Sequence, residues 1–119
     1  MVVWVFVWVL VWVLVWVLAT LSRVVAESFE WDAKKDVANQ AKHGVAFAQA
    51  QFAFADTSRV IARDLSHSAT EHRFYCFGKV EAGVLTVRFT YRAGVIRIIG
   101  AGFWRRGKAV YEQESRLHE

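Results

Sequence analysis

The hydrophobic pattern changes abruptly after an apolar N-terminal stretch, and the first regular element follows that change. Asp32 suits a helix N-cap because its carboxylate can accept hydrogen bonds from the free amides of a first turn. Apolar residues then recur at every fourth position from Ala33 to Ala41. Gly44 can adopt the left-handed conformation that ends a helix. The pattern predicts a helix over about 33–43.

The remaining pattern predicts a second helix, a run of strands and a closing helix. Phenylalanine and alanine at helical spacing favour a short helix within Val45–Ala55, and the basic segment Trp104–Leu117 is predicted to form the last helix. Ala93 and Gly94 form a tight hairpin turn between two strands. The predicted strands, which alternate or are rich in branched and aromatic residues, are Arg59–Asp64, Arg73–Val80, Val84–Arg92 and Val95–Ala101.

This order of elements predicts the class of the fold. A short strand, two helices, an antiparallel meander and a C-terminal helix make an α+β fold, in which the helices are expected on one face of the sheet. Within 84–92 one face is apolar and carries Leu85, Val87, Phe89 and Tyr91, while Thr86, Arg88, Thr90 and Arg92 share the other. The folded domain is predicted to span residues 27–119.

Residues 1–26 form an apolar extension outside this predicted fold. They carry a repeated Val-Trp-Val-Leu tetrapeptide, and three interpretations stay open. The repeat can be low-complexity sequence translated upstream of a true start near Val24 or Val25, which would leave a cytoplasmic protein. It can be an inner-membrane anchor, because Val2–Ala19 is just long enough to cross a bilayer. A signal peptide fits less well, because a basic leading region is missing.

Composition narrows the class of protein further. The chain has 15 Lys and Arg against 11 Asp and Glu, for a net charge of +4 at neutral pH. A single cysteine, Cys76, excludes an internal disulfide framework and a multi-thiolate metal site. The aromatic content of 15% and the lack of proline exclude disordered and collagen-like classes. Composition alone therefore indicates a small basic domain that can contact RNA.

The loop between the first two long strands holds the most reactive side chains. His67 lies in a polar segment before a strand, where a histidine can act as a general acid or base. A solvated loop histidine is the simpler alternative. Asp64, His67 and either Glu71 or His72 could bind a metal ion, but their spacing matches no structural metal site.

Basic residues on the strands and the last helix suggest contact with an anion. Arg97 stands between Ile96 and Ile98, so it is expected to pair with a carboxylate or to face an anion. The run from Trp104 to Lys108 places cations beside a large aromatic ring, which suits phosphate contact and base stacking. Arg88 and Arg92 fit an ordinary solvated surface equally well.

Four groups of residues resemble the motifs of the BrnT family of bacterial toxins. The first is Phe29-Glu30-Trp31-Asp32 with Lys35, Asn39 and Lys42-His43-Gly44-Val45-Ala46-Phe47, and the second is Phe54 with Asp56. The third is Asp64, His67, Glu71 and Arg73 with Gly78. The fourth is Ile96-Arg97-Ile98-Ile99-Gly100-Ala101-Gly102-Phe103-Trp104-Arg105-Arg106-Gly107-Lys108 with Tyr111-Glu112. The resemblance covers about residues 29–114.

The resemblance implies a RelE-like fold and a ribonuclease toxin of a type II toxin–antitoxin system. Such a toxin halts translation and is neutralised by a BrnA-type antitoxin, with which it can form a hetero-oligomer. Many members carry Ser-Ala-Arg after the final strand, where this chain has Gly100-Ala101-Gly102 and lacks that arginine. The competing hypothesis is a non-catalytic basic module, either a degenerate toxin or a membrane-anchored domain that binds an anionic partner.

Metal-free RNA cleavage needs a base, an acid and cations that stabilise the phosphorane, and side chains can supply all three without a cofactor. We assign His67 to acid–base chemistry and Arg73 and Arg97 to phosphate stabilisation, and Glu71 would orient one of these groups. The residues expected to bind RNA are Lys42, His43, Arg88, Tyr91, Arg92, Trp104, Arg105, Arg106 and Lys108.

Overall fold

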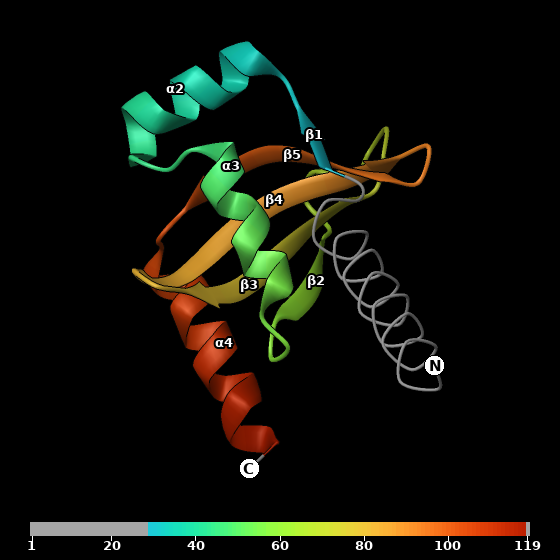
Figure 1. The fold of residues 1–119 in the computed structure, drawn as a ribbon. Helices are drawn as coiled ribbons and strands as arrows, with labels where there is room; N and C mark the ends of the chain where they lie inside the picture. Colours follow the sequence, from blue (N-terminus) through green and yellow to red (C-terminus); the bar gives the residue numbers. More distant parts are fainter. Residues whose placement is uncertain (1–28, 119) are drawn as a thin grey trace, which may run out of the picture.

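The computed structural model describes residues 29–118, which form a five-stranded sheet with helices against it (Figure 1). The apolar extension and the predicted domain boundary at residue 27 lie outside the described residues. The elements, in chain order, are β1 (Phe29–Trp31), α2 (Ala33–His43), α3 (Phe47–Ala50), the 3-10 helix η1 (Gln51–Ala55), β2 (Val60–Asp64), β3 (Arg73–Val80), β4 (Gly83–Arg92), β5 (Val95–Gly102) and α4 (Arg105–Leu117).

Helix α2 begins and ends where its sequence predicts. The Asp32 carboxylate accepts hydrogen bonds from the backbone amides of Lys34 and Lys35 at 2.8 and 3.1 Å. Gly44 has a φ of 67°, a left-handed conformation that a glycine adopts without strain, and its amide donates to the carbonyl of Gln40. Both predicted ends of this helix are therefore confirmed.

The sheet has the order β1-β5-β4-β3-β2. Strands β2 to β5 form the predicted antiparallel meander, and β1 adds a parallel edge strand against β5. The turn between β4 and β5 is the predicted one, with positive φ values of 52° at Ala93 and 78° at Gly94. These pairings confirm the α+β fold class.

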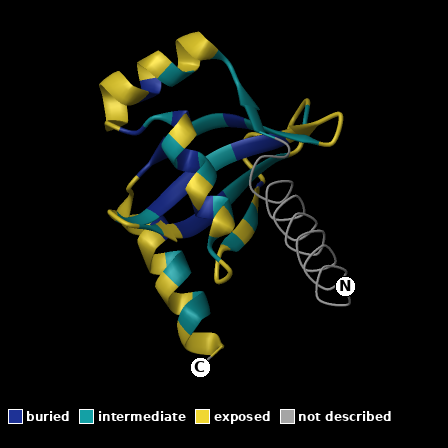
Figure 2. Cartoon of the chain, in the orientation of Figure 1, coloured by how far each residue is buried: buried dark blue, intermediate teal, exposed yellow. Residues whose placement is uncertain are grey.

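One face of the sheet is covered by α3 and η1, which cross it in Figure 1. The core lies beneath them, and the strand residues there are dark blue in Figure 2. Leu85, Val87 and Phe89 of β4 are fully buried on this face, as the alternation within 84–92 predicts. Gly78 permits the close approach of η1, since a Cβ there would lie 2.1 Å from the carbonyl oxygen of Ala53.

Helix α4 packs on the opposite face, so the prediction that the helices share one face is wrong for this helix. A Cβ on Gly107 would lie 1.9 Å from the Thr86 hydroxyl oxygen and 3.0 Å from the Phe77 ring. Helix α4 therefore packs directly on Thr86 and Phe77. Alternation along β4 and β3 sends both side chains away from the main core, and the small Thr86 leaves room for a helix backbone. Further along α4, Tyr111 donates to the Asp56 carboxylate at 2.7 Å.

Asn39 completes the edge of the sheet where β1 ends. Its amide nitrogen donates to the carbonyls of Val45 and Ala101 at 2.8 and 2.9 Å, and its amide oxygen accepts from the Ala101 amide at 3.1 Å. This buried side chain thus replaces a neighbouring strand along β5 and ties α2 to the sheet.

Replacing Asn39 by alanine is expected to lower the free energy of unfolding by about 2 kcal/mol or more, because buried backbone groups of Val45 and Ala101 lose their partners. That loss corresponds to roughly 10 °C in Tm for a domain of this size. Thermal unfolding followed by circular dichroism measures it. Gln40→Ala is the matched control, since Gln40 is exposed and its side chain donates a hydrogen bond to the Asp36 carboxylate at 3.2 Å on the surface of the same helix. Equal Tm values for the two variants would contradict this role of Asn39.

Within residues 29–118, no helix combines the length and apolar character needed to cross a membrane.

Candidate functional site

The face that α4 partly covers carries a row of polar residues across all five strands. Cross-strand partners lie directly opposite each other and share a face. The register places Asp64 opposite Arg73, Arg73 opposite Thr90, Thr90 opposite Arg97, and Arg97 opposite Glu30. These five residues are called the polar row below. Helix α4 contacts this face at the end that holds Thr86 and Phe77. The polar row lies at the other end of the face, which α4 leaves open.

At one end of the polar row, Asp64 forms a pair with His67. The His67 Nδ1 lies 2.9 Å from Asp64 Oδ2, and the aspartate side chain is 2% exposed while the histidine is 53% exposed. Ser66 donates to the other carboxylate oxygen at 3.0 Å, and the Ser68 hydroxyl holds the loop by donating to the Asp64 carbonyl. When Nδ1 carries the proton of this contact, Nε2 is left free to exchange a proton with a substrate.

The Asp64 carboxylate stays ionised in this position. Burial alone would raise the pKa of Asp64, but the hydrogen bonds from Ser66 and His67 outweigh burial and lower it. A charged carboxylate can fix the orientation of the imidazole and stabilise its protonated form. The pair therefore has the arrangement of an acid–base group with a buried orienting partner.

Arg88 and Tyr75 lie beside this pair. The two residues are opposite each other in the β3–β4 register, and Arg88 Nη2 is 3.8 Å from Asp64 Oδ2. Burial, followed by the charge of Asp64, raises the pKa of Tyr75, so the phenol keeps its proton. The Arg88 guanidinium is about one-third exposed and can contact an anion bound next to His67.

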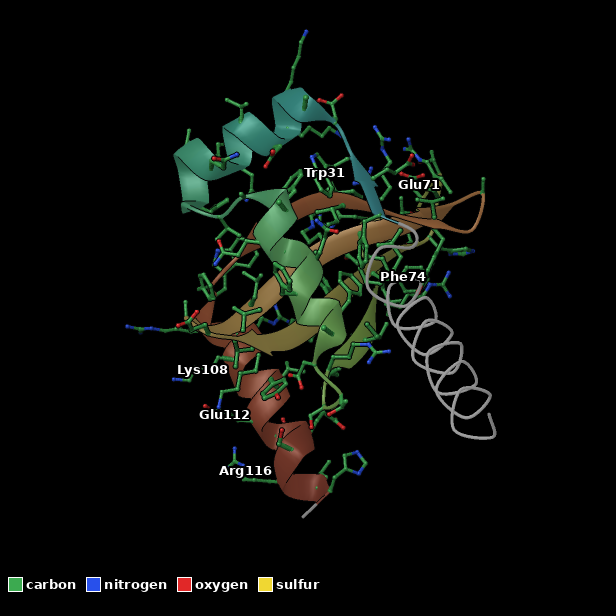
Figure 3. All side chains as sticks on the ribbon, viewed as in Figure 1. Trp31, Glu71, Phe74, Lys108, Glu112 and Arg116 are labelled. Atoms are coloured by element: carbon green, nitrogen blue, oxygen red, sulfur yellow. The ribbon has the colours of Figure 1, made fainter. Side chains whose placement is uncertain are left out.

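Glu71 contacts two arginines. It lies at the end of the sheet away from α4, where Figure 3 labels it. It accepts hydrogen bonds from Arg92 at 3.3 Å and lies 3.7 Å from Arg73 Nη2. The hydrogen bond from Arg92 is the main reason that the pKa of Glu71 is lowered. The Arg73 Nε is buried and lacks a hydrogen-bond partner among the residues that the structure describes. Glu71 thus contacts Arg73 and Arg92, whereas the partner of His67 is Asp64.

Arg97 pairs with Glu30 of the neighbouring strand β1. The Arg97 Nη1 lies 3.4 Å from Glu30 Oε1, and the arginine side chain is 25% exposed. The sequence left two options for Arg97, a paired carboxylate or an anion, and the structure shows the carboxylate.

Two cavities extend from the open face toward the helices. The larger has a volume of about 840 Å³ and lies between β2–β4 and the start of α4, and its walls include Asp64, Tyr75 and Arg106. The smaller, of about 340 Å³, lies between α2 and β5 and is lined by Lys42 and His43 among others. Five of the residues predicted to bind RNA line these cavities: Lys42, His43, Arg88, Trp104 and Arg106.

The other predicted RNA-binding residues lie apart from the cavities. Tyr91 is on the opposite face, where its ring packs edge-on against Phe74 and Phe89. Arg105 is exposed at the start of α4. The Lys108 Nζ lies 3.9 Å from Glu112 Oε1 on the same helix, where Figure 3 labels both side chains. Arg92 is held by Glu71. The structure therefore places five of the predicted RNA-binding residues at the two cavities and the other four away from them.

Two residues beside His67, Asp64 and Tyr75, were not among the site residues predicted from the sequence. Asp64 entered only as a possible metal ligand and as part of the third motif, although it lies three residues before His67 at the end of a strand. Tyr75 gives no local signal, because its place opposite Arg88 depends on the strand register. Among residues 29–118, no group of three or more His, Cys, Asp or Glu side chains comes together. Cys76 lies in the core, where burial raises its pKa to about 12.

The fold and the site define a small α+β protein with a histidine–aspartate pair and clustered arginines on an open sheet face. Residues 31–107 match the family model described as the ribonuclease toxin BrnT of a type II toxin–antitoxin system. The chain belongs to this family, which confirms the resemblance seen in its motifs and implies an antitoxin partner. Among curated proteins, no significant match to the chain is found.

Proposed function

We propose that this chain cleaves RNA by internal transesterification without a metal ion, and that it acts in the cytoplasm to inhibit translation until a BrnA-type antitoxin neutralises it. Family membership supports a ribonuclease toxin at the level of class. The observation that carries the finer proposal is the His67–Asp64 pair, with its buried carboxylate and half-exposed imidazole, beside the Arg88 guanidinium.

The chemistry requires two proton transfers around one phosphate. A base takes the proton of the 2′-hydroxyl, the 2′-oxygen attacks phosphorus, and the P–O5′ bond breaks as an acid gives a proton to the 5′-oxygen. The products are a 2′,3′-cyclic phosphate and a 5′-hydroxyl. His67 performs proton transfer at Nε2, and Asp64 keeps the imidazole oriented for it.

Arginines stabilise the negative charge that develops on the phosphorane. Arg73 lies in the strand next to Asp64 in the polar row, and Arg88 approaches the same carboxylate at 3.8 Å. The Arg88 guanidinium thus lies beside the His67–Asp64 pair, while Glu71 positions Arg73 in the polar row. Arg97 stands two strands beyond Arg73 and is assigned a supporting contact. Donors that are held in place before the reaction cost little reorganisation when charge develops.

Cleavage by the purified protein is expected to survive excess EDTA, because side chains supply the acid, the base and the cations. The assay is gel analysis of a labelled RNA, with the product ends identified by their susceptibility to phosphatase and kinase. A cyclic phosphate and a 5′-hydroxyl are the expected ends. Loss of cleavage on chelation, with recovery on adding a divalent ion, would show that the metal-free mechanism is wrong.

Induced expression of the chain in a bacterial host is expected to arrest growth and reduce incorporation of labelled amino acids. Co-expression of the neighbouring antitoxin gene is expected to restore both, and a His67→Ala chain serves as the inactive control. Unimpaired growth at confirmed soluble expression would instead favour a non-catalytic basic binding module.

A further inference from the structure

The two cavities share a wall. Arg88 and Trp104 line both of them, so these two side chains stand between the two cavities. The larger cavity holds the aromatic rings of Tyr75 and Phe77 beside the Asp64 carboxylate. A molecule that fills both cavities must therefore cross Trp104 and Arg88, close to the His67–Asp64 pair.

The position of the Trp104 ring is fixed from two sides. A Cβ on Gly102 would lie 2.6 Å from the indole, which means that the ring packs directly on the bare backbone of β5. On another side the His43 ring meets the indole edge-on, with the ring centres 5.1 Å apart. The Trp104 residue remains 37% exposed. The chain thus holds a rigid aromatic surface at the junction of the two cavities.

The lining of the two cavities differs in character. The larger cavity is lined by the rings of Tyr75, Phe77 and Trp104 together with the arginines Arg63, Arg88 and Arg106. The smaller has the Trp104 indole beside four groups that can carry positive charge, Lys35, Lys42, His43 and Arg88. In single-stranded nucleic acids the bases stack on aromatic rings and the phosphates bind cations. A volume of about 840 Å³ is within the range of sites that enclose a small organic ligand.

We infer that the larger cavity holds one nucleotide of the RNA with its base stacked against Trp104, and that the smaller cavity receives the next phosphate of the strand. Arg88 contacts the phosphate between them. This inference rests on the proposed function, because it identifies RNA as the occupant and Trp104 as the residue that positions it. The affinity for RNA then depends on the presence of a base at one position of the strand.

The test measures binding separately from cleavage. A labelled single-stranded RNA with 2′-O-methyl groups lacks the attacking hydroxyl, so its affinity for the full chain is read by fluorescence anisotropy. Trp104→Ala is expected to weaken binding by about 5- to 150-fold, the effect of losing one stacked base. Trp104→Phe keeps an aromatic ring and is expected to lose less. Phe103→Ala is the matched control, since Phe103 is an exposed neighbouring aromatic residue that lines neither cavity.

Two further measurements separate stacking from a general loss of fold. Gly102→Ala displaces the Trp104 ring and is expected to weaken binding in the native chain but not in the Trp104→Ala background. In a series of oligonucleotides with single abasic sites, one site is expected to weaken binding to the native chain and to leave binding to Trp104→Ala unchanged.

The inference is overturned if every abasic oligonucleotide binds the native chain equally, or if both Trp104→Ala and Gly102→Ala bind within twofold of it. Should Trp104→Ala fail to fold, Trp104→Phe and Gly102→Ala decide the question. If binding depends on Trp104 but unmodified RNA is never cleaved, the proposed catalytic function fails while the nucleotide site stands.

Discussion

Replacing His67 by alanine is expected to lower the rate of RNA cleavage by about 100- to 10,000-fold, the usual contribution of a general acid or base. The fold should remain intact, because the His67 side chain is half-exposed and its hydrogen-bond partners are the neighbouring Asp64 and Ser66. Single-turnover cleavage of a labelled RNA measures the rate, and thermal unfolding confirms that the variant is folded.

His72→Ala is the matched control for this prediction. His72 lies at the other end of the same loop, is exposed, and contacts Arg63 outside the polar row. Asp64→Asn is expected to lower the cleavage rate as well, since an amide removes the charge that orients and stabilises the imidazole. Wild-type cleavage by His67→Ala, or equal losses for His67→Ala and His72→Ala, would mean that His67 is not the acid–base group.

The elements of the fold could be predicted because their signals are local. Asp32 and Gly44 cap α2 through hydrogen bonds to residues at most four positions away. The alternation within 84–92 predicts which face of β4 is buried. The side of the sheet that α4 covers has no such signal. It depends on contacts among Thr86, Phe77 and Gly107, which lie on three different elements. The local sequence around each of these residues does not indicate that contact.

The site could be predicted only in part for the same reason. His67 and its loop stand out in the sequence, and Asp64 lies within three residues of it. The polar row depends instead on pairing between strands, and Arg97 meets Glu30 only because β1 joins the sheet parallel to β5. The cavities depend on longer-range contacts still, since Trp104 reaches His43 across the chain. The sequence therefore identifies candidate site residues, but it does not identify the residues that they contact in the folded protein.

The last prediction concerns the two arginines of the polar row. Arg73→Gln is expected to lower cleavage by about a hundredfold or more, because it removes a cation from the residue opposite Asp64 in the polar row. Its melting temperature should stay near the native value, since the Arg73 side chain is 32% exposed and its contact with Glu71 is long, at 3.7 Å. An ion pair with that exposure contributes about 0–1 kcal/mol.

Arg97→Gln is the matched comparison, because it removes the same charge from the same row two strands away. Its loss of cleavage is expected to be smaller than that of Arg73→Gln, with a change in melting temperature of at most a few degrees from the lost contact with Glu30. If Arg97→Gln loses more cleavage than Arg73→Gln, the scissile phosphate lies toward β1 and Glu30 becomes the carboxylate that positions its arginine. If both variants keep full activity, or both unfold, neither arginine stabilises the phosphorane, and Arg88 remains as the cation beside His67.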